Sequence, residues 1–87
     1  MSFTIIWKST VLDRLADFNV ASTDAERKQM AGGVEHLNRQ LEQNPLDVGE
    51  SRHAGYRVAF PPLLMVTFSV DESNREVRVV HLVRFGR

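Results

Sequence analysis

Cysteine is absent from the 87 residues of this sequence. A disulfide framework and a cysteine-based metal site are therefore both excluded. The three histidines, His36, His53 and His81, are scattered at spacings that match no common metal-ligand motif. We accordingly expect a protein that works without a metal and without any other cofactor.

An excess of either charge is also missing, because 11 basic residues balance 11 acidic ones. This balance disfavours nonspecific binding to nucleic acid through the charge of the whole molecule, but it does not exclude a local basic patch. The longest apolar stretch, residues 60–68, contains two prolines and is too short to cross a bilayer. No basic region precedes the apolar residues 3–7, so we expect no signal peptide, no membrane partner and a cytoplasmic location.

The residues that are present predict one small domain that begins with a strand and two helices. Eighty-seven residues can build a single modest core, so we expect one domain over residues 1–87. The aromatic and β-branched residues 3–7 predict a short strand. Two capping patterns then predict helix starts. They are Thr10 with Asp13 for the first helix and Thr23 with Glu26 for the second.

The second predicted helix is amphipathic, because its apolar residues recur at steps of four, three and four. Gly32 and Gly33 lie within it, and each costs roughly 0.5–1 kcal/mol relative to alanine. They either kink the helix or let it approach a neighbouring element closely. Asn44 and Pro45 end the helix, since a residue before proline avoids the α region. The apolar face consists of Met30, Val34, Leu37 and Leu41.

Three segments in the C-terminal half alternate with period two and predict strands: Arg52–Phe60, Leu63–Val70 and Glu76–Phe85. Consecutive antiparallel strands make a meander, and the N-terminal strand joins its edge. The helices would then pack as a hairpin on one face of the sheet. The sequence thus predicts an α+β fold, in which a two-helix hairpin covers one face of a four-stranded, mainly antiparallel sheet in the order β-α-α-β-β-β.

An arginine inside an apolar strand draws attention to the helix-free face of this predicted sheet. Alternation places Arg57 and Ala59 on the helix-free face. The residues it places toward the core are Tyr56, Val58 and Phe60. A guanidinium is permanently charged and matches carboxylate and phosphate geometry, so Arg57 either pairs with an acidic residue of the chain or binds an anionic ligand. In the last strand we assign His81 to the helix side and Arg78, Val80, Leu82 and Arg84 to the helix-free face. In the strand before it, the residues assigned to the helix-free face are Met65, Thr67 and Ser69. A register shift of one residue would move His81 to the helix-free face.

These assignments predict a basic site at one end of the helix-free face. Arg57 and Arg84 would converge there on an anion such as a phosphodiester or an acidic peptide. His81 and His53 are the candidate proton carriers, although a lone histidine is more often simply solvated. The predicted site residues are Arg57, Arg84 and His81 for catalysis and Arg52, His53 and Arg87 for binding.

The segments NPLDVGESR, GYRVAF, LLMVTFSVD and VRVVHLVRF resemble the RelE/ParE superfamily, the toxins of bacterial type II toxin–antitoxin systems, which include plasmid stabilisation proteins. The likeness covers nearly the whole chain and includes the β-α-α-β-β-β order. It implies the RelE/ParE-like fold and an antitoxin partner that packs on the sheet and the helices. The sharpest matches are Asn44, Pro45, Gly49, Gly55, Tyr56 and Arg57.

The resembled superfamily divides by function. RelE-like members cut mRNA on the ribosome with arginines and lysines on the sheet, often with a tyrosine or histidine near the C-terminus. ParE-like members inhibit DNA gyrase and lack that set. Arg57 matches the sheet arginine, and Arg84 or Arg87 matches the basic residue at the end of the last strand. This chain departs from the RelE-like pattern: no tyrosine follows the last strand, and Arg52 and His53 stand in place of the lysines.

Three functions are consistent with this resemblance. The first is a ribosome-dependent mRNA endonuclease, a metal-independent enzyme in which Arg57 and Arg84 stabilise the phosphate while His81 or His53 moves the proton. The second is a non-enzymatic inhibitor of gyrase, and the third is a degenerate toxin that binds only its antitoxin. The helix-free face discriminates among them. A nuclease needs convergent basic groups and a proton carrier there, whereas a binding protein needs an exposed apolar patch.

Overall fold

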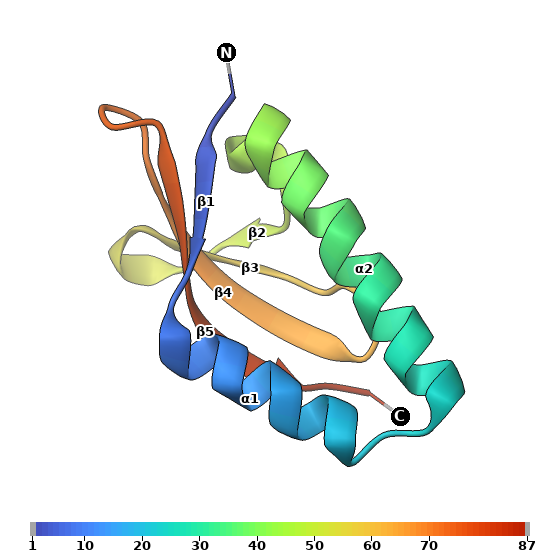
Figure 1. Ribbon diagram of the computed structural model, residues 1–87. Helices are drawn as coiled ribbons and strands as arrows, with labels where there is room; N and C mark the ends of the chain where they lie inside the picture. The colour runs from blue at the N-terminus through green and yellow to red at the C-terminus, as the bar shows by residue number, and fades with distance from the viewer. Residues whose placement is uncertain (1, 87) are drawn as a thin grey trace.

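The computed structural model describes residues 2–86 and contains two helices and one five-stranded sheet (Figure 1). Within that range neither helix combines the length and the apolar character that crossing a membrane requires. In chain order the elements are β1 (Thr4–Trp7), α1 (Ser9–Val20), α2 (Asp24–Gln43), the 3-10 turn η1 (Pro45–Asp47), β2 (Glu50–Ser51), the 3-10 turn η2 (His53–Gly55), β3 (Tyr56–Ala59), β4 (Leu64–Asp71) and β5 (Glu76–Arg84).

The strands lie in the order β1-β5-β4-β3-β2. β1 pairs with β5 in parallel, and the other three pairings are antiparallel. The predicted α+β class is confirmed, but the prediction of four strands was wrong. The predicted strand Arg52–Phe60 is shortened to β3, because a turn precedes Tyr56 in which Ala54 and Gly55 adopt positive φ angles of 62° and 78°. The fifth strand, β2, comes from Glu50 and Ser51, which lie before the predicted strand, and it pairs with β3.

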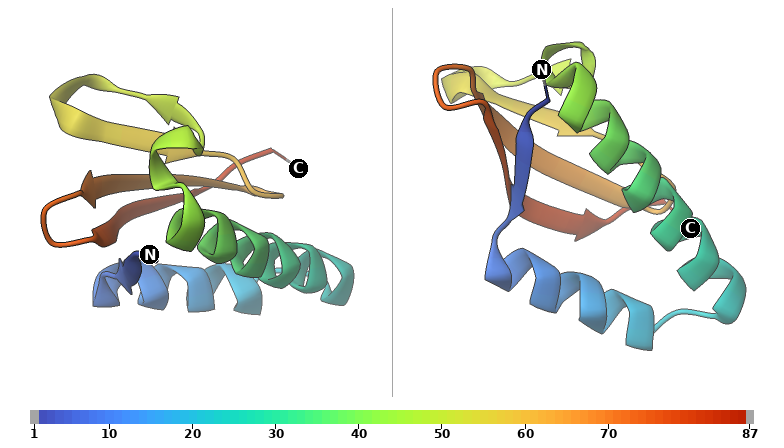
Figure 2. Two further views of the ribbon diagram at one scale, coloured as in Figure 1. Left: turned by 90° about the horizontal axis from the view of Figure 1, so that it is seen from above. Right: turned by 45° about the horizontal axis from the view of Figure 1, so that its top comes forward.

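Both helices lie on one side of the sheet, as the two views of Figure 2 show. They diverge from their connection at residues 21–23, so the predicted hairpin is splayed. The capping box at Thr23 and Glu26 is confirmed, with the Glu26 backbone N–H donating to Thr23 Oγ1 at 3.2 Å and the Thr23 N–H donating to Glu26 Oε1 at 2.9 Å. The predicted Thr10 cap is wrong: α1 follows Lys8, and no side chain caps it.

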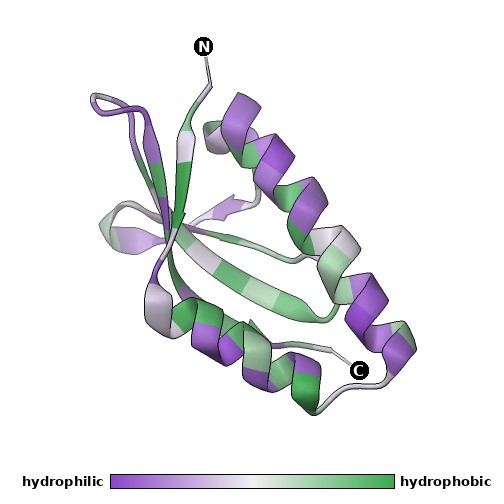
Figure 3. Cartoon of the chain, viewed as in Figure 1, coloured by the Kyte–Doolittle hydropathy of each residue, from purple (hydrophilic) through white to green (hydrophobic). Residues whose placement is uncertain are grey.

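The hydrophobic core lies between the helices and the sheet. Its members include Phe68, which is fully buried at the middle of β4, and the predicted apolar face of α2, of which Met30, Leu37 and Leu41 are buried. The hydropathy colouring in Figure 3 shows the alternation of apolar and polar turns along both helices. The strands contribute Val58, Ala59, Leu64, Val66, Phe68, Val77, Val79 and Leu82 to the buried set.

The structure resolves the roles of the two glycines in α2. A Cβ on Gly33 would lie 2.6 Å from Cδ of Pro62, whereas a Cβ on Gly32 would meet nothing within 4 Å. Gly33 therefore allows α2 to approach the turn between β3 and β4 closely, and Gly32 is open. Of the two predicted roles of these glycines, a helix kink or close approach to a neighbouring element, the structure confirms close approach for Gly33.

A β-bulge in β5 controls which side chains reach each face of the sheet. Phe68 is the register partner of Val79, but the next residue back, Thr67, is the partner of His81, so Val80 is extra. The buried residues of β5 accordingly change from Val77 and Val79 before the bulge to Leu82 after it. The alternation predicted for this strand therefore holds only in its first half.

Candidate functional site: the helix-free face of the sheet

Arg57 lies on the helix-facing side of the sheet, contrary to prediction. Register partners share a face, and Arg57 pairs with the buried Phe68 while its neighbour Ala59 pairs with the buried Val66. Of the three side chains predicted to face the core, Val58 is buried, but Tyr56 and Phe60 are exposed. The error arose because both faces of this short strand carry apolar residues, so alternation identified two faces without showing which one the helices cover.

The Arg57 guanidinium is occupied by contacts within the chain. Its Nε donates to the Val48 carbonyl at 3.0 Å, and its two terminal nitrogens donate to Ser51 Oγ at 3.0 Å and to the Gly49 carbonyl at 3.2 Å. These bonds tie β3 to the segment that enters β2. Gly49 itself approaches so closely that a Cβ there would lie 1.9 Å from the Val58 carbonyl oxygen. Arg57 therefore holds a tightly packed edge of the sheet together.

Arg84 also lies on the helix-facing side, because it follows the bulge and pairs with the buried Leu64. One terminal nitrogen donates to Glu26 Oε2 at 3.2 Å, and the other approaches the Leu63 carbonyl oxygen at 3.4 Å. The Thr23 backbone N–H and the Arg84 charge together hold the pKa of Glu26 below its ordinary value, against the opposing effect of burial. Arg84 thus has a structural acidic partner, whereas Arg57, for which such a partner was one of the two predicted roles, bonds two carbonyls and a hydroxyl instead.

The predicted convergence of Arg57 and Arg84 is also wrong. Arg57 pairs with Phe68 and Arg84 with Leu64. These partners are four residues apart on β4, which at about 3.3 Å per residue separates them by roughly 13 Å along the sheet. Two guanidiniums with separate internal partners at that spacing do not form one site for a single phosphate.

His81 is exposed on the helix-free face, where it pairs with Thr67. The prediction placed it on the helix side and noted that a shift of one residue would reverse it. The bulge at Val80 supplies that shift. His81 is therefore the one predicted catalytic residue that the structure places on the helix-free face within the described chain.

The predicted binding residues lie apart from His81. Arg52 is exposed and forms an ion pair with Glu50 at 3.1 Å. His53 lies in the exposed turn η2. Both belong to the hairpin between β2 and β3, at the opposite edge of the sheet from β1. Arg87 lies outside the described residues.

The polar part of the helix-free face was predicted in part: Ser69 and Arg78 were assigned to this face, whereas Tyr56 was assigned to the core. Tyr56, Ser69 and Arg78 follow one another across β3, β4 and β5 as register partners, and His81 lies further along β5. Arg78 is the arginine that this face carries within the described strands, and its Nε and a terminal nitrogen both donate to Glu76 Oε1, at 3.2 and 3.0 Å. An anion at Arg78 would have to compete with this carboxylate. The sequence reasoning missed that Glu76, two residues before Arg78 and therefore on the same face, pairs with it.

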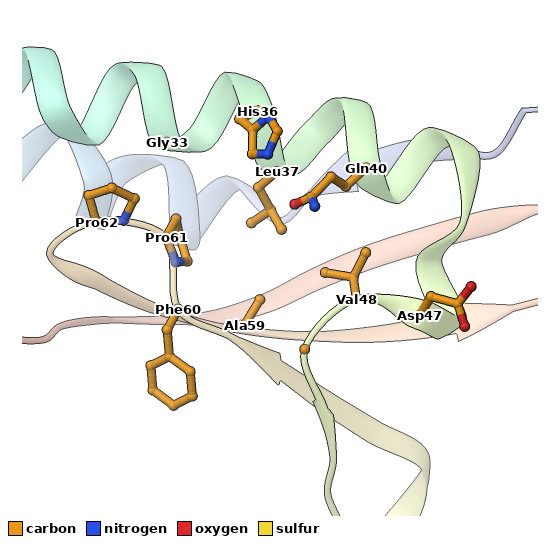
Figure 4. Close-up of a pocket in the computed structure, with 11 residues that line it drawn as sticks. Gly33, His36, Leu37, Gln40, Asp47, Val48, Ala59, Phe60, Pro61 and Pro62 are labelled. Atoms are coloured by element: carbon orange, nitrogen blue, oxygen red, sulfur yellow. The ribbon is translucent and has the colours of Figure 1, made fainter.

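The apolar part of the helix-free face centres on an aromatic pair. The ring centroids of Phe60 and Phe85 are 5.1 Å apart, and the two residues are 46% and 52% exposed. Phe60 also borders a cavity of about 310 Å³ between α2 and β3. Its ring points away from α2, which places it on the helix-free face (Figure 4). Met65 and Val83 are register partners on the same face. We call these four residues, Phe60, Met65, Val83 and Phe85, the aromatic patch.

The helix-free face is thus better suited to protein contact than to phosphate chemistry. It offers one guanidinium, already paired, one imidazole and an exposed aromatic patch. Across the described residues, cysteine, histidine, aspartate and glutamate form no group of three or more that could hold a metal ion. A large apolar surface on a small protein typically marks an interaction site.

Comparisons with known proteins point to a fold and to no sequence family. No family model matches the chain, and no curated protein matches it either. Three solved structures do. A chain of the toxin–antitoxin complex RelBE2 from Mycobacterium tuberculosis aligns with a TM-score of 0.76 and 19% identity, over 100% of this chain and 95% of that one.

The other two structures agree with the first. A chain of the chromosomal ParDE system from P. aeruginosa aligns with a TM-score of 0.69 and 16% identity, over 97% of both chains. A chain of the archaeal RelE–RelB complex from Pyrococcus horikoshii OT3 aligns with a TM-score of 0.66 and 15% identity, over 100% of this chain and 99% of that one. The chain has the RelE/ParE-like toxin fold.

Proposed function

We propose that this protein is the toxin component of a toxin–antitoxin pair and acts by binding a protein target through the aromatic patch. The observation that carries the proposal is the placement of Arg57 and Arg84. Both guanidiniums are engaged within the chain on the helix-facing side, while Phe60 and Phe85 are exposed on the helix-free face. Exposed aromatic residues are the usual anchors of protein interfaces.

A nuclease mechanism has weaker support in this geometry. Phosphodiester cleavage needs cations positioned where charge develops on the phosphate. The helix-free face carries Arg78 for that purpose, and Glu76 already neutralises it. His81 could move a proton, but the one other basic side chain of the described strands on its face is the already paired Arg78. The ParE-like alternative, a non-enzymatic inhibitor with DNA gyrase as its target, needs no such cluster.

An antitoxin is the second partner that we propose. The three similar structures are described as a toxin–antitoxin complex, a chromosomal ParDE TA system and a RelE–RelB complex. A protein of this fold that arrests growth would be tolerated by its host only when a partner neutralises it. The gene beside the one for this protein is the natural place to look for that partner.

Induced expression in a bacterial host tests the proposal. We expect the unmodified protein to arrest growth without new mRNA ends in primer extension. The double variant Phe60→Ser with Phe85→Ser should lose the arrest. The matched control is Leu12→Ser with Leu46→Ser, because these leucines are 50% and 48% exposed outside the aromatic patch. This control should still arrest growth, and both double variants should be shown to fold by circular dichroism.

The other outcomes are equally informative. New mRNA ends that disappear in Arg78→Ala or His81→Ala would reject the binding mechanism and establish a nuclease on the helix-free face. Arrest that survives loss of both phenylalanines would reject the aromatic patch as the contact surface. An unmodified protein that neither arrests growth nor cuts mRNA would reject the toxin activity and favour a degenerate member that binds only its antitoxin.

A further inference from the structure

The outer edge of β5 is only half covered by β1. The parallel pairing runs from Thr4 opposite Glu76 to Trp7 opposite Val79, and the chain then turns into α1 at Lys8. From Val80 onward, β5 has β4 on one side and, within residues 2–86, no strand on the other. An uncovered strand edge is a template for pairing with another chain.

The backbone direction of this edge can be read from two hydrogen bonds. The Phe85 N–H donates to the Leu63 carbonyl at 2.8 Å, so the odd-numbered residues after the bulge direct their backbone groups toward β4. Arg14 Nε, from α1, donates to the Leu82 carbonyl at 2.7 Å, so the even-numbered residues direct theirs outward. The N–H groups of Leu82 and Arg84 therefore point to the uncovered edge. In the described chain neither of them meets a strand partner there.

A groove of about 420 Å³ runs between α1 and this edge. Asp13 and Asp17 lie along it, one helical turn apart, and neither carboxylate has an ion pair among the described residues. Like charges at this spacing repel each other, so a cation bound in the groove would relieve the repulsion between the two carboxylates. We call it the α1–β5 groove. Its lining residues are Thr10, Val11, Asp13, Arg14 and Asp17 of α1 and Val80, His81 and Leu82 of β5.

The chain already places one cation in this groove. While Arg14 Nε bonds the Leu82 carbonyl, the Arg14 guanidinium lies 5.4 Å from the centre of the Phe18 ring. A cationic N–H donor thus occupies the position that the backbone N–H of an added strand would take. Without a partner, the Leu82 carbonyl in the groove thus accepts its hydrogen bond from a cationic side chain of α1.

We propose that the α1–β5 groove binds an extended, basic segment of a partner protein, which adds as a strand to the outer edge of β5. Backbone hydrogen bonds to Leu82 and Arg84 would supply affinity, as in other cases of strand addition. Asp13 and Asp17 would select lysine or arginine at alternate positions of that segment. This site is a sheet edge, separate from the aromatic patch, and it does not depend on the function proposed above.

The probe for this site is the capped peptide Lys-Val-Lys-Val-Lys-Val-Lys, titrated into ¹⁵N-labelled protein and followed by NMR. We expect shifts confined to α1 and the second half of β5, with slower hydrogen exchange at the amides of Leu82 and Arg84. The glutamate peptide Glu-Val-Glu-Val-Glu-Val-Glu should bind at least about tenfold more weakly, because it places like charges beside Asp13 and Asp17. N-methylation of alternate amides should abolish binding of the lysine peptide.

Two sets of variants locate the effect. Asp13→Asn with Asp17→Asn should weaken binding about fivefold at low salt, as the loss of two exposed charge pairs does. The matched control Glu35→Gln with Glu42→Gln removes two exposed carboxylates of α2 and should leave the affinity unchanged. Arg14→Ala frees the Leu82 carbonyl and should tighten binding, whereas Arg39→Ala, an exposed arginine of α2, should not.

Three results would overturn the proposal. Shifts that centre on Phe60 and Phe85 would place the peptide on the aromatic patch. Equal affinity for the lysine and glutamate peptides would remove the role of the two aspartates. Absence of any shift at millimolar lysine peptide, in protein that melts normally, would show that the edge does not accept a strand.

Discussion

Arg84 donates a hydrogen bond to the carboxylate of Glu26 over 3.2 Å and so joins the end of β5 to the first turn of α2. The same carboxylate closes the capping box, because its other oxygen accepts the N–H of Thr23 at 2.9 Å. One side chain therefore caps a helix and anchors a strand that is far away in the sequence. Arg84 is a structural residue of this fold.

The link between Glu26 and Arg84 should make stability depend on pH. The Thr23 N–H and the Arg84 charge lower the pKa of Glu26 from 4.5, so its ionised form stabilises the fold above that pH and loses its effect as the pH falls through the lowered value. Glu26→Gln keeps the capping oxygen and removes the charge. We expect this variant to melt below the unmodified protein at pH 7, with the gap closing in acid.

Thermal melts between pH 7 and pH 3 measure this effect. Glu42→Gln removes a carboxylate of α2 away from Thr23 and Arg84 and controls for the loss of one negative charge. A gap for Glu26→Gln that stays constant down to pH 3 would show that the charge of this residue contributes nothing.

Arg57→Ala should destabilise the protein. The substitution removes three hydrogen bonds to Val48, Gly49 and Ser51, and we expect a loss of about 1–3 kcal/mol in the free energy of unfolding. Arg57→Lys should recover only part of it, since an ammonium cannot reproduce the fork of a guanidinium. Urea denaturation checks both variants. An unchanged transition midpoint for Arg57→Ala would return Arg57 to the predicted role of a free, ligand-binding cation.

Alanine at the two adjacent glycines of α2 should act in opposite directions. Gly33→Ala places a Cβ 2.6 Å from Pro62, and the overpacking should cost about 1–3 kcal/mol. Gly32→Ala meets nothing within 4 Å and should stabilise the helix by up to about 1 kcal/mol. Parallel urea denaturation of the two variants gives a direct comparison. Equal effects at both positions would contradict the close approach of α2 to the β3–β4 turn.

Phe68→Ala should be the most damaging of these substitutions. Phe68 is fully buried between the helices and the sheet, and large-to-small changes of this kind cost about 3–5 kcal/mol. In a domain this small that loss approaches the whole stability. Leu12→Ala, at a half-exposed position of α1, is the control and should cost less than about 1 kcal/mol. A Phe68→Ala protein that melts like this control would show that the core is elsewhere.

The local pattern of the sequence determined those features of the fold that depend only on residues close to one another in the chain. The capping box at Thr23 and Glu26, the apolar face of α2 and the alternation of β4 were all predicted correctly, because each depends on residues within a few positions of one another. The order of the two helices and of β1, β3, β4 and β5 followed from the same signals, whereas β2 was not predicted. So did the burial of Phe68.

Only the tertiary structure decided which side chains share a face. The bulge at Val80 depends on how β5 pairs with β4, and it moves His81 to the helix-free face and Arg84 to the helix side. Arg57 faces the helices because its partner is Phe68, a relationship that the alternation of β3 alone could not contain. A period of two defines two faces of a strand, but the register with its neighbours determines which of them is covered.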